Sequence, residues 1–164
     1  MQRCLATVAL LCAMSSIARA QTSGSPSPPP SDESRKKADV QEAVLRYQIA
    51  TWDLSAVSYC VKVDGKDADK DFLLRLRPLP VMPASQCRKQ TPAKLKGLYH
   101  VVDKQTKKKA VIFRMGEIRW IKQSEAEIDG GYDCASLCMA HGTYHVVWDG
   151  TRWTVSAFNI IIQS

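Results

Sequence analysis

The sequence lacks the short motifs that mark common catalytic and nucleotide-binding sites. It contains no G-x-S-x-G nucleophile elbow, no P-loop, no G-x-G-x-x-G fingerprint and no H-E-x-x-H metal motif. Its three histidines, His100, His141 and His145, show no ligand spacing with the cysteines. We therefore expect neither a metal site nor a cofactor, and we favour a binding protein over an enzyme.

An acidic stretch near the middle of the chain also fails as a calcium site. Asp64, Asp67, Asp69 and Asp71 follow one another closely, but Gly65 stands second rather than sixth in the loop and no Glu closes it. Acidic residues are favoured at the N-terminus of a helix, so we expect a short helix to begin here.

Long hydrophobic runs are missing after residue 20, so we expect no membrane-spanning segment. The first twenty residues have a basic start, an apolar run over Cys4–Met14 and the triplet Ala18-Arg-Ala20. This order is typical of a secretory signal peptide, and it predicts cleavage near Ala20 and a periplasmic or secreted bacterial protein. Residues 21–35, rich in Ser and Pro, predict a disordered linker, which leaves a single domain over residues 36–164.

Four cysteines remain outside the predicted signal peptide, namely Cys60, Cys87, Cys134 and Cys138. In an oxidising compartment an even number of cysteines predicts disulfides, and three pairings are open. We favour Cys60–Cys87 with Cys134–Cys138, because each bridge then closes a local loop.

The first half of the predicted domain mixes helices with one strand. Asp39-Val-Gln-Glu42 resembles a capping box and predicts a helix through Trp52 with a broad apolar face. A strand over 56–63 and a short helix over 68–76 follow. The segment 78–97 has little periodicity, and we expect it to be a loop held by the Cys60–Cys87 bridge.

The second half reads as consecutive strands from Lys109 onward. Asp149-Gly150 predicts a two-residue hairpin turn, which would pair Trp148 with Thr151 and Val146 with Trp153. The predicted core face of this hairpin holds Tyr144, Val146, Trp148, Trp153 and Val155. His141 and His145 are expected to be exposed on the polar face, with no recognisable carboxylate partner. The predicted fold is α+β, with an N-terminal helix packed against a curved antiparallel sheet.

Several segments resemble an uncharacterised family of secreted bacterial proteins. They are Gly65-Lys-Asp67 with Asp71-Phe-Leu73, Ile118-Arg-Trp120, Gly130-Gly-Tyr132, and Gly142-Thr-Tyr144 with Gly150-Thr-Arg-Trp-Thr-Val155. The order of helix, strands and closing G-x-x-W-x-V strand is also similar to the NTF2-like (cystatin-like) roll. The first resemblance implies export and assigns no activity. The second implies a cone-shaped sheet with a cavity against the helix, used for ligands, catalysis or protein contacts.

Three hypotheses follow for function. The favoured one is an exported, non-enzymatic module that binds a protein or a small ligand. Its candidate pocket residues are Tyr47, Trp120 and Tyr132. The sequence does not decide between a monomer and a homodimer. The second is an NTF2-like enzyme with an acid/base site in the cavity. The third is an anion or nucleic-acid binder, because eight Lys and Arg residues face one Asp between Arg88 and Lys109. No aromatic residues alternate with these cations as base stacking would require, so nucleic acid is not favoured.

Overall fold

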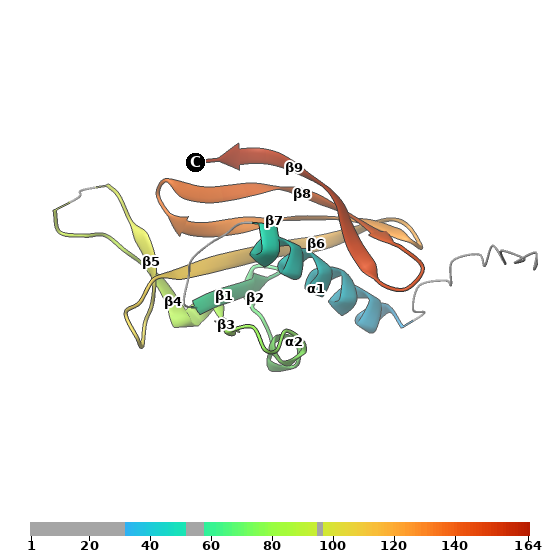
Figure 1. Cartoon of the computed structure of the whole chain (residues 1–164), viewed down its shortest axis with the longest axis horizontal. Helices are drawn as coiled ribbons and strands as arrows, with labels where there is room; N and C mark the ends of the chain where they lie inside the picture. Colours follow the sequence, from blue (N-terminus) through green and yellow to red (C-terminus); the bar gives the residue numbers. More distant parts are fainter. Residues whose placement is uncertain (1–31, 52–57, 95–96) are drawn as a thin grey trace, which may run out of the picture.

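A computed structural model of the chain describes residues 32–51, 58–94 and 97–164. Its elements, in chain order, are α1 (Glu33–Thr51), β1 (Ser58–Val63), β2 (Lys66–Asp67), α2 (Lys70–Arg75), β3 (Val81–Pro83), the 3-10 helix η1 (Ala84–Gln86), β4 (Cys87–Gln90), β5 (His100–Asp103), β6 (Ala110–Lys122), β7 (Glu125–Ala135), β8 (Cys138–Trp148) and β9 (Trp153–Gln163). One long helix packs on a large mixed sheet, which confirms the α+β class (Figure 1).

The prediction of an antiparallel sheet was wrong in part, because the sheet is mixed. Strands β6, β7, β8 and β9 form an antiparallel series, but β1 runs parallel to both β6 and β3. The chain leaves β1 through α2 and β3 to β5 before it returns as β6. Such a long crossover allows the returning strand to lie parallel to its neighbour, whereas a short hairpin does not.

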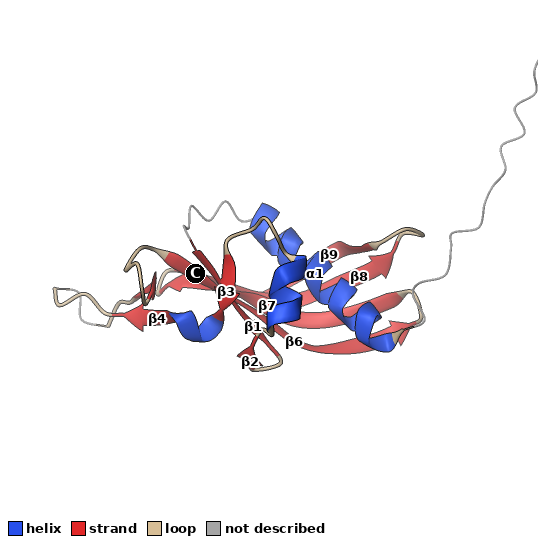
Figure 2. Cartoon of the chain, turned by 90° about the horizontal axis from the view of Figure 1, so that it is seen from below, coloured by secondary structure: helices blue, strands red, loops and turns tan. Residues whose placement is uncertain are grey.

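The core lies between α1 and one face of β6–β9, which the helix crosses (Figure 2). Val40, Val44 and Leu45 of α1 are completely buried there, together with Phe113 and Tyr144 of the sheet. Burying an aliphatic or aromatic side chain of this size stabilises the fold by about 1.5–3 kcal/mol.

The long helix begins earlier than the predicted capping box. The Asp32 carboxylate accepts hydrogen bonds from the backbone N–H groups of Ser34 (3.0 Å) and Arg35 (3.3 Å), so Asp32 caps the helix. The prediction of a cap at Asp39 was wrong, because the Asp39 carboxylate instead binds Arg75. Residues 33–35, assigned to the linker, are helical. The predicted signal peptide and the rest of the linker lie outside the described residues, as does Trp52.

The middle of the chain contains more regular structure than expected. The short helix α2 covers Lys70–Arg75 rather than 68–76, and the Asp69 carboxylate caps it by accepting from the Phe72 N–H at 2.8 Å. The predicted loop over 78–97 was wrong in part, because it contains β3, η1 and β4. These short strands are specified by pairing with β1 and β5, which local periodicity does not reveal.

The favoured cysteine pairing is confirmed. Cys60 of β1 pairs with Cys87 of β4 at a Cα–Cα distance of 6.2 Å, and Cys134 pairs with Cys138 at 5.3 Å across the β7–β8 turn. The first bridge joins segments separated by 27 residues, and the second spans only four.

The register of the last hairpin differs from the prediction, although its faces do not. Trp148 pairs with Trp153 and Val146 with Val155, so four residues rather than two form the loop. A shift of two residues leaves each side chain on its original face. Tyr144, Val146 and Trp153 are accordingly buried, while Trp148 and Val155 pack at the edge of the core.

Gly131 of β7 allows β7 and β8 to approach closely. A Cβ atom at this position would lie 1.9 Å from the carbonyl oxygen of Ala140, a backbone atom that cannot move independently. We expect Gly131→Ala to destabilise the protein by about 3 kcal/mol in urea unfolding. Gly65→Ala is the matched control, since it has open space around it and only the cost of a positive φ, about 1 kcal/mol. Equal losses from both variants would contradict the packing described for β7 and β8.

The two disulfides should contribute unequally to stability. A bridge that closes a longer loop removes more conformational entropy from the unfolded chain. Replacing Cys60 and Cys87 by Ala should lower the free energy of unfolding by about 3.5 kcal/mol, and replacing Cys134 and Cys138 by about 2 kcal/mol. Denaturant unfolding of the two double variants measures both values, and the reverse order would contradict this prediction.

Candidate functional site

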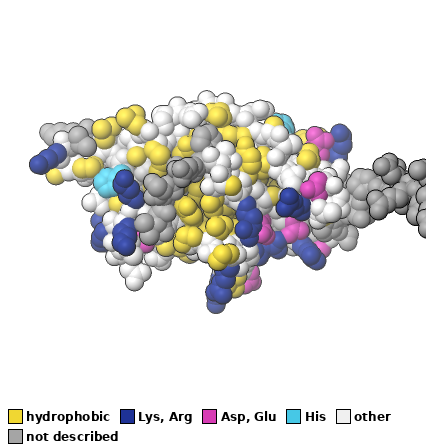
Figure 3. Space-filling view, viewed as in Figure 1, with side chains coloured by type: hydrophobic (Ala, Val, Ile, Leu, Met, Phe, Trp, Pro, Cys, Tyr) yellow, Lys and Arg dark blue, Asp and Glu magenta, His cyan; other side chains and the backbone are white. Residues whose placement is uncertain are grey.

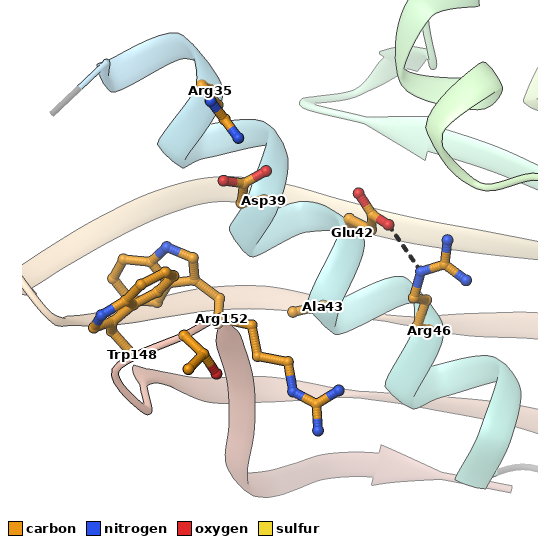
Figure 4. A pocket seen from close by; sticks show the side chains of 9 residues that line it. Arg35, Asp39, Glu42, Ala43, Arg46, Trp148 and Arg152 are labelled. Carbon is orange, nitrogen blue, oxygen red and sulfur yellow. Dashed lines mark hydrogen bonds and ion pairs between the residues drawn. The ribbon is translucent and has the colours of Figure 1, made fainter. Parts of the chain in front are cut away.

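A pocket of about 480 Å³ lies between α1 and the tip of the β8–β9 hairpin (Figure 4). This volume is within the range of sites that hold small ligands. The lining residues are Arg35, Asp39, Glu42, Ala43, Arg46, Trp148, Thr151, Arg152 and Trp153.

The charged wall of the pocket comes from one stripe of α1. Arg35, Asp39, Glu42 and Arg46 are spaced by four, three and four residues, a spacing that places them on the same side of a helix. Figure 4 shows these side chains along the helix where it faces the hairpin. This spacing is visible in the sequence, but the site prediction did not use it.

Arg75 of α2 neutralises the acidic part of this wall. Its guanidinium binds the Asp39 carboxylate and also the Glu42 carboxylate at 3.0 Å, while Arg46 binds Glu42 at 2.9 Å. Burial of Arg75 disfavours its charge, but its hydrogen bonds to Asp39 and Glu42 outweigh this effect and raise its pKa. Both carboxylates of the pocket are therefore already paired with arginines.

The hairpin side of the pocket is held by Asp149. Its carboxylate accepts hydrogen bonds from the Thr151 hydroxyl (2.7 Å), the Thr151 N–H (2.9 Å) and the Arg152 N–H (3.0 Å). These bonds close the four-residue loop and place Arg152 at the pocket. The Arg152 guanidinium lies 3.7 Å from Asp149 and its side chain is 80% exposed, so solvent screens this ion pair strongly.

Indole rings form the apolar wall. The ring centroids of Trp148 and Trp153 are 5.9 Å apart, and those of Trp120 and Trp153 are 5.7 Å apart. The Lys36 ammonium group stands 4.1 Å from the centre of the Trp120 ring, a cation–π contact that ties α1 to this wall. The pocket thus combines arginines with an aromatic surface.

The three residues predicted to line a pocket lie elsewhere. Tyr47 packs edge-on against Tyr144 beneath α1, with ring centroids 6.0 Å apart, and Tyr132 is buried in the same core. Burial raises the pKa of Tyr144, and the neighbouring Tyr47 and Tyr132 add to this effect. Trp120 packs against Trp153 of the indole wall. None of the three lines the pocket between α1 and the hairpin.

The histidines also lie outside the pocket, and they are half-buried rather than exposed. His145 has a carboxylate partner that the sequence prediction missed: its Nδ1 atom lies 3.2 Å from Glu127, and its Nε2 atom lies 3.0 Å from the Asn159 amide nitrogen. Glu127 and His145 are direct cross-strand neighbours, a relation that only the register of β7 and β8 reveals. Burial, followed by the nearby Arg114, lowers the pKa of His141.

Part of the basic segment 88–109 makes contacts inside the protein. Lys89 and Arg114 bind the buried carboxylate of Asp133 at 2.7 Å and 3.1 Å, and the Tyr99 hydroxyl donates to the same group at 2.8 Å. Asp133 is only 1% exposed, so these partners satisfy a charge that water does not reach. The lysines of the turn 104–109 stay exposed, and Figure 3 shows Lys and Arg gathered at the β4–β5 end with few acidic side chains.

Comparison with protein-family models, curated proteins and solved structures found no match to this chain. Within the described residues, no helix is long and apolar enough to cross a membrane. No group of three or more His, Cys, Asp or Glu side chains in that part of the chain is arranged to hold a metal ion.

The Asp149 turn should be sensitive to acid in a defined range. Hydrogen bonds from the Thr151 hydroxyl and from the Arg152 and Thr151 N–H groups lower the pKa of Asp149 to about 2. Because this pKa is depressed on folding, its stabilising contribution is complete above the ordinary value of 3.8 and is lost as the pH falls to about 2. A carboxyl-detected NMR titration should show this pKa, and Asp149→Asn should flatten the dependence of stability on pH over the same range. Titration of Asp149 at its ordinary value would contradict the described turn.

Proposed function

We propose that the chain is an exported, non-enzymatic binding module that holds a small anionic ligand in the pocket between α1 and the β8–β9 hairpin. The first twenty residues predict export, and the two disulfides suit an oxidising compartment. The packing of one helix on a sheet is compatible with the suggested NTF2-like roll, in which members bind small ligands or proteins.

One observation favours an anionic ligand. Arg75 reaches Asp39 and Glu42 from outside the pocket, and Arg46 also binds Glu42, so the other lining arginines, Arg35 and Arg152, are not needed to neutralise these carboxylates. In the described residues, no carboxylate lies within 4 Å of the Arg35 guanidinium, and Arg152 has only its distant contact with Asp149. A guanidinium binds carboxylate or phosphate through two parallel hydrogen bonds, and such groups suit Arg35 and Arg152.

The indole wall adds a second requirement. Trp148 is half-buried and packs on the buried Trp153, so a ligand held beside it gains from a flat or apolar body that shields the Trp148 ring from water. We therefore propose a ligand with a carboxylate or phosphate group joined to an apolar or aromatic part. No histidine lines this pocket, which favours binding over acid–base catalysis.

Phenyl phosphate is a suitable probe, because it joins a dianion to an aromatic ring. We expect saturable binding at low salt by isothermal titration calorimetry or by NMR shifts of the indole N–H signals. Inorganic phosphate should bind more weakly, since it lacks the ring, and phenol should bind more weakly, since it lacks the charge. Absence of saturable phenyl phosphate binding would refute the proposed ligand class.

Arginine variants test whether phenyl phosphate binds in this pocket. Loss of one charge-assisted contact costs about 1.5–3 kcal/mol, so Arg35→Ala and Arg152→Ala should each weaken phenyl phosphate binding roughly tenfold or more. Arg88→Ala on β4 is the matched control, an exposed arginine outside the pocket. An equal loss in the control variant would show general attraction to a basic protein rather than a defined site.

Export has a separate test. After expression with its own N-terminus in a bacterial host, the chain should be recovered outside the cytoplasm. Its N-terminal sequence should begin at Gln21, and it should contain no free thiol. Retention in the cytoplasm with residues 1–20 intact would contradict the predicted signal peptide.

A further inference from the structure

Exposed apolar side chains concentrate at one end of the sheet. Among the described residues, seven large hydrophobic side chains are exposed, and five of them belong to this end. They are Leu98 (40%), Leu137 (76%), Ile160 (47%), Ile161 (73%) and Ile162 (55%). We call these five residues the apolar end.

Hydrogen bonds show that the apolar end is one continuous region. The Ser136 hydroxyl accepts from the Tyr99 N–H at 2.7 Å, which places Leu98 and Leu137 in adjacent segments. The Ser164 hydroxyl donates to the Ser136 carbonyl at 3.4 Å, which brings the end of β9 to the same turn. Exposed apolar surface of this kind, when contiguous, marks an interaction site more often than scattered single residues do.

Strand β9 adds an open edge to this surface. It pairs with β8 and with no other described strand, and Figure 1 shows it at the border of the sheet. Between Trp153 and Gln163 it has no charged residue and no proline, although 24% of the whole chain is charged. Natural edge strands usually carry Lys or Pro to prevent pairing with another strand, and β9 lacks both.

Two irregularities limit where a second strand can align. The register between β8 and β9 shifts at Ser156 and again at Ile161, and such bulges bend an edge. The run 157–160 between them is regular, so it offers an even ladder of backbone groups beside the apolar end.

We propose that β9 pairs antiparallel with β9 of a second copy of this chain, around residues 157–160, to form a two-fold symmetric dimer. An antiparallel strand pair is self-complementary, so the same edge serves both copies. The uncharged edge also lets two chains that each carry a net positive charge meet without facing cations. Antiparallel alignment around residues 157–160 brings Ile160, Ile161 and Ile162 of each copy to the interface, and these three residues are the part of the apolar end that the dimer uses. The same alignment directs Leu98, Leu137 and the basic β4–β5 ends of the two copies away from each other, whereas parallel alignment would bring the basic ends together.

Light scattering coupled to size-exclusion chromatography tests the dimer. The purified chain should have twice its single-chain mass at micromolar concentration. Ile161→Lys places a charge on each copy at the interface and should raise the dissociation constant at least tenfold, while Ile121→Lys on β6, with a similarly exposed isoleucine, should leave the dimer intact. Circular dichroism checks that both variants are folded.

Hydrogen exchange provides a second readout that does not depend on a variant. Backbone amides of residues 157–160 should exchange more slowly as the protein concentration rises, whereas those of β6 should not change. A monomeric wild-type chain at high micromolar concentration would overturn the proposal, and so would a folded Ile161→Lys variant that stays dimeric.

Discussion

The packing of α1 against strands β6–β9 is the interaction on which the rest of the structure depends. Val40, Val44 and Leu45 bury one side of the helix in the sheet, and this fixes the rotation of the helix about its axis. The charged stripe from Arg35 to Arg46 then faces the β8–β9 hairpin. Without this contact there is no pocket, because one wall comes from the helix and the other from the hairpin.

Sequence patterns predicted which side chains of the last hairpin face the core, but they did not predict which residues pair across its two strands. The alternation of apolar and polar residues has a period of two, so it assigns Tyr144 and Val146 to the core whichever even register the hairpin takes. The turn type could not be read from Asp149-Gly150 alone. The Asp149 side chain closes a four-residue loop through its own hydrogen bonds, and this competes with the two-residue turn that the same dipeptide favours.

Apart from the Cys60–Cys87 bridge, the contacts between segments distant in sequence were not predicted. The parallel pairing of β1 with β6 joins segments about fifty residues apart, and no local pattern distinguishes it from an antiparallel pair. The helix start was missed because Asp32 and Asp39 are both acceptable caps, and only the contact of Asp39 with Arg75 decides between them. The same limit applies to the site, since Arg75 and the Glu127–His145 pair join elements that are distant in sequence.

Native-state hydrogen exchange of α1 tests the central claim most directly. Amides of the buried segment Val40–Gln48 are expected to exchange only through global unfolding, with the same dependence on denaturant as the amides of β7 and β8. Fast exchange of these helix amides by a local opening, while β7 and β8 stay protected, would show that the helix is not fixed on the sheet and would contradict the account.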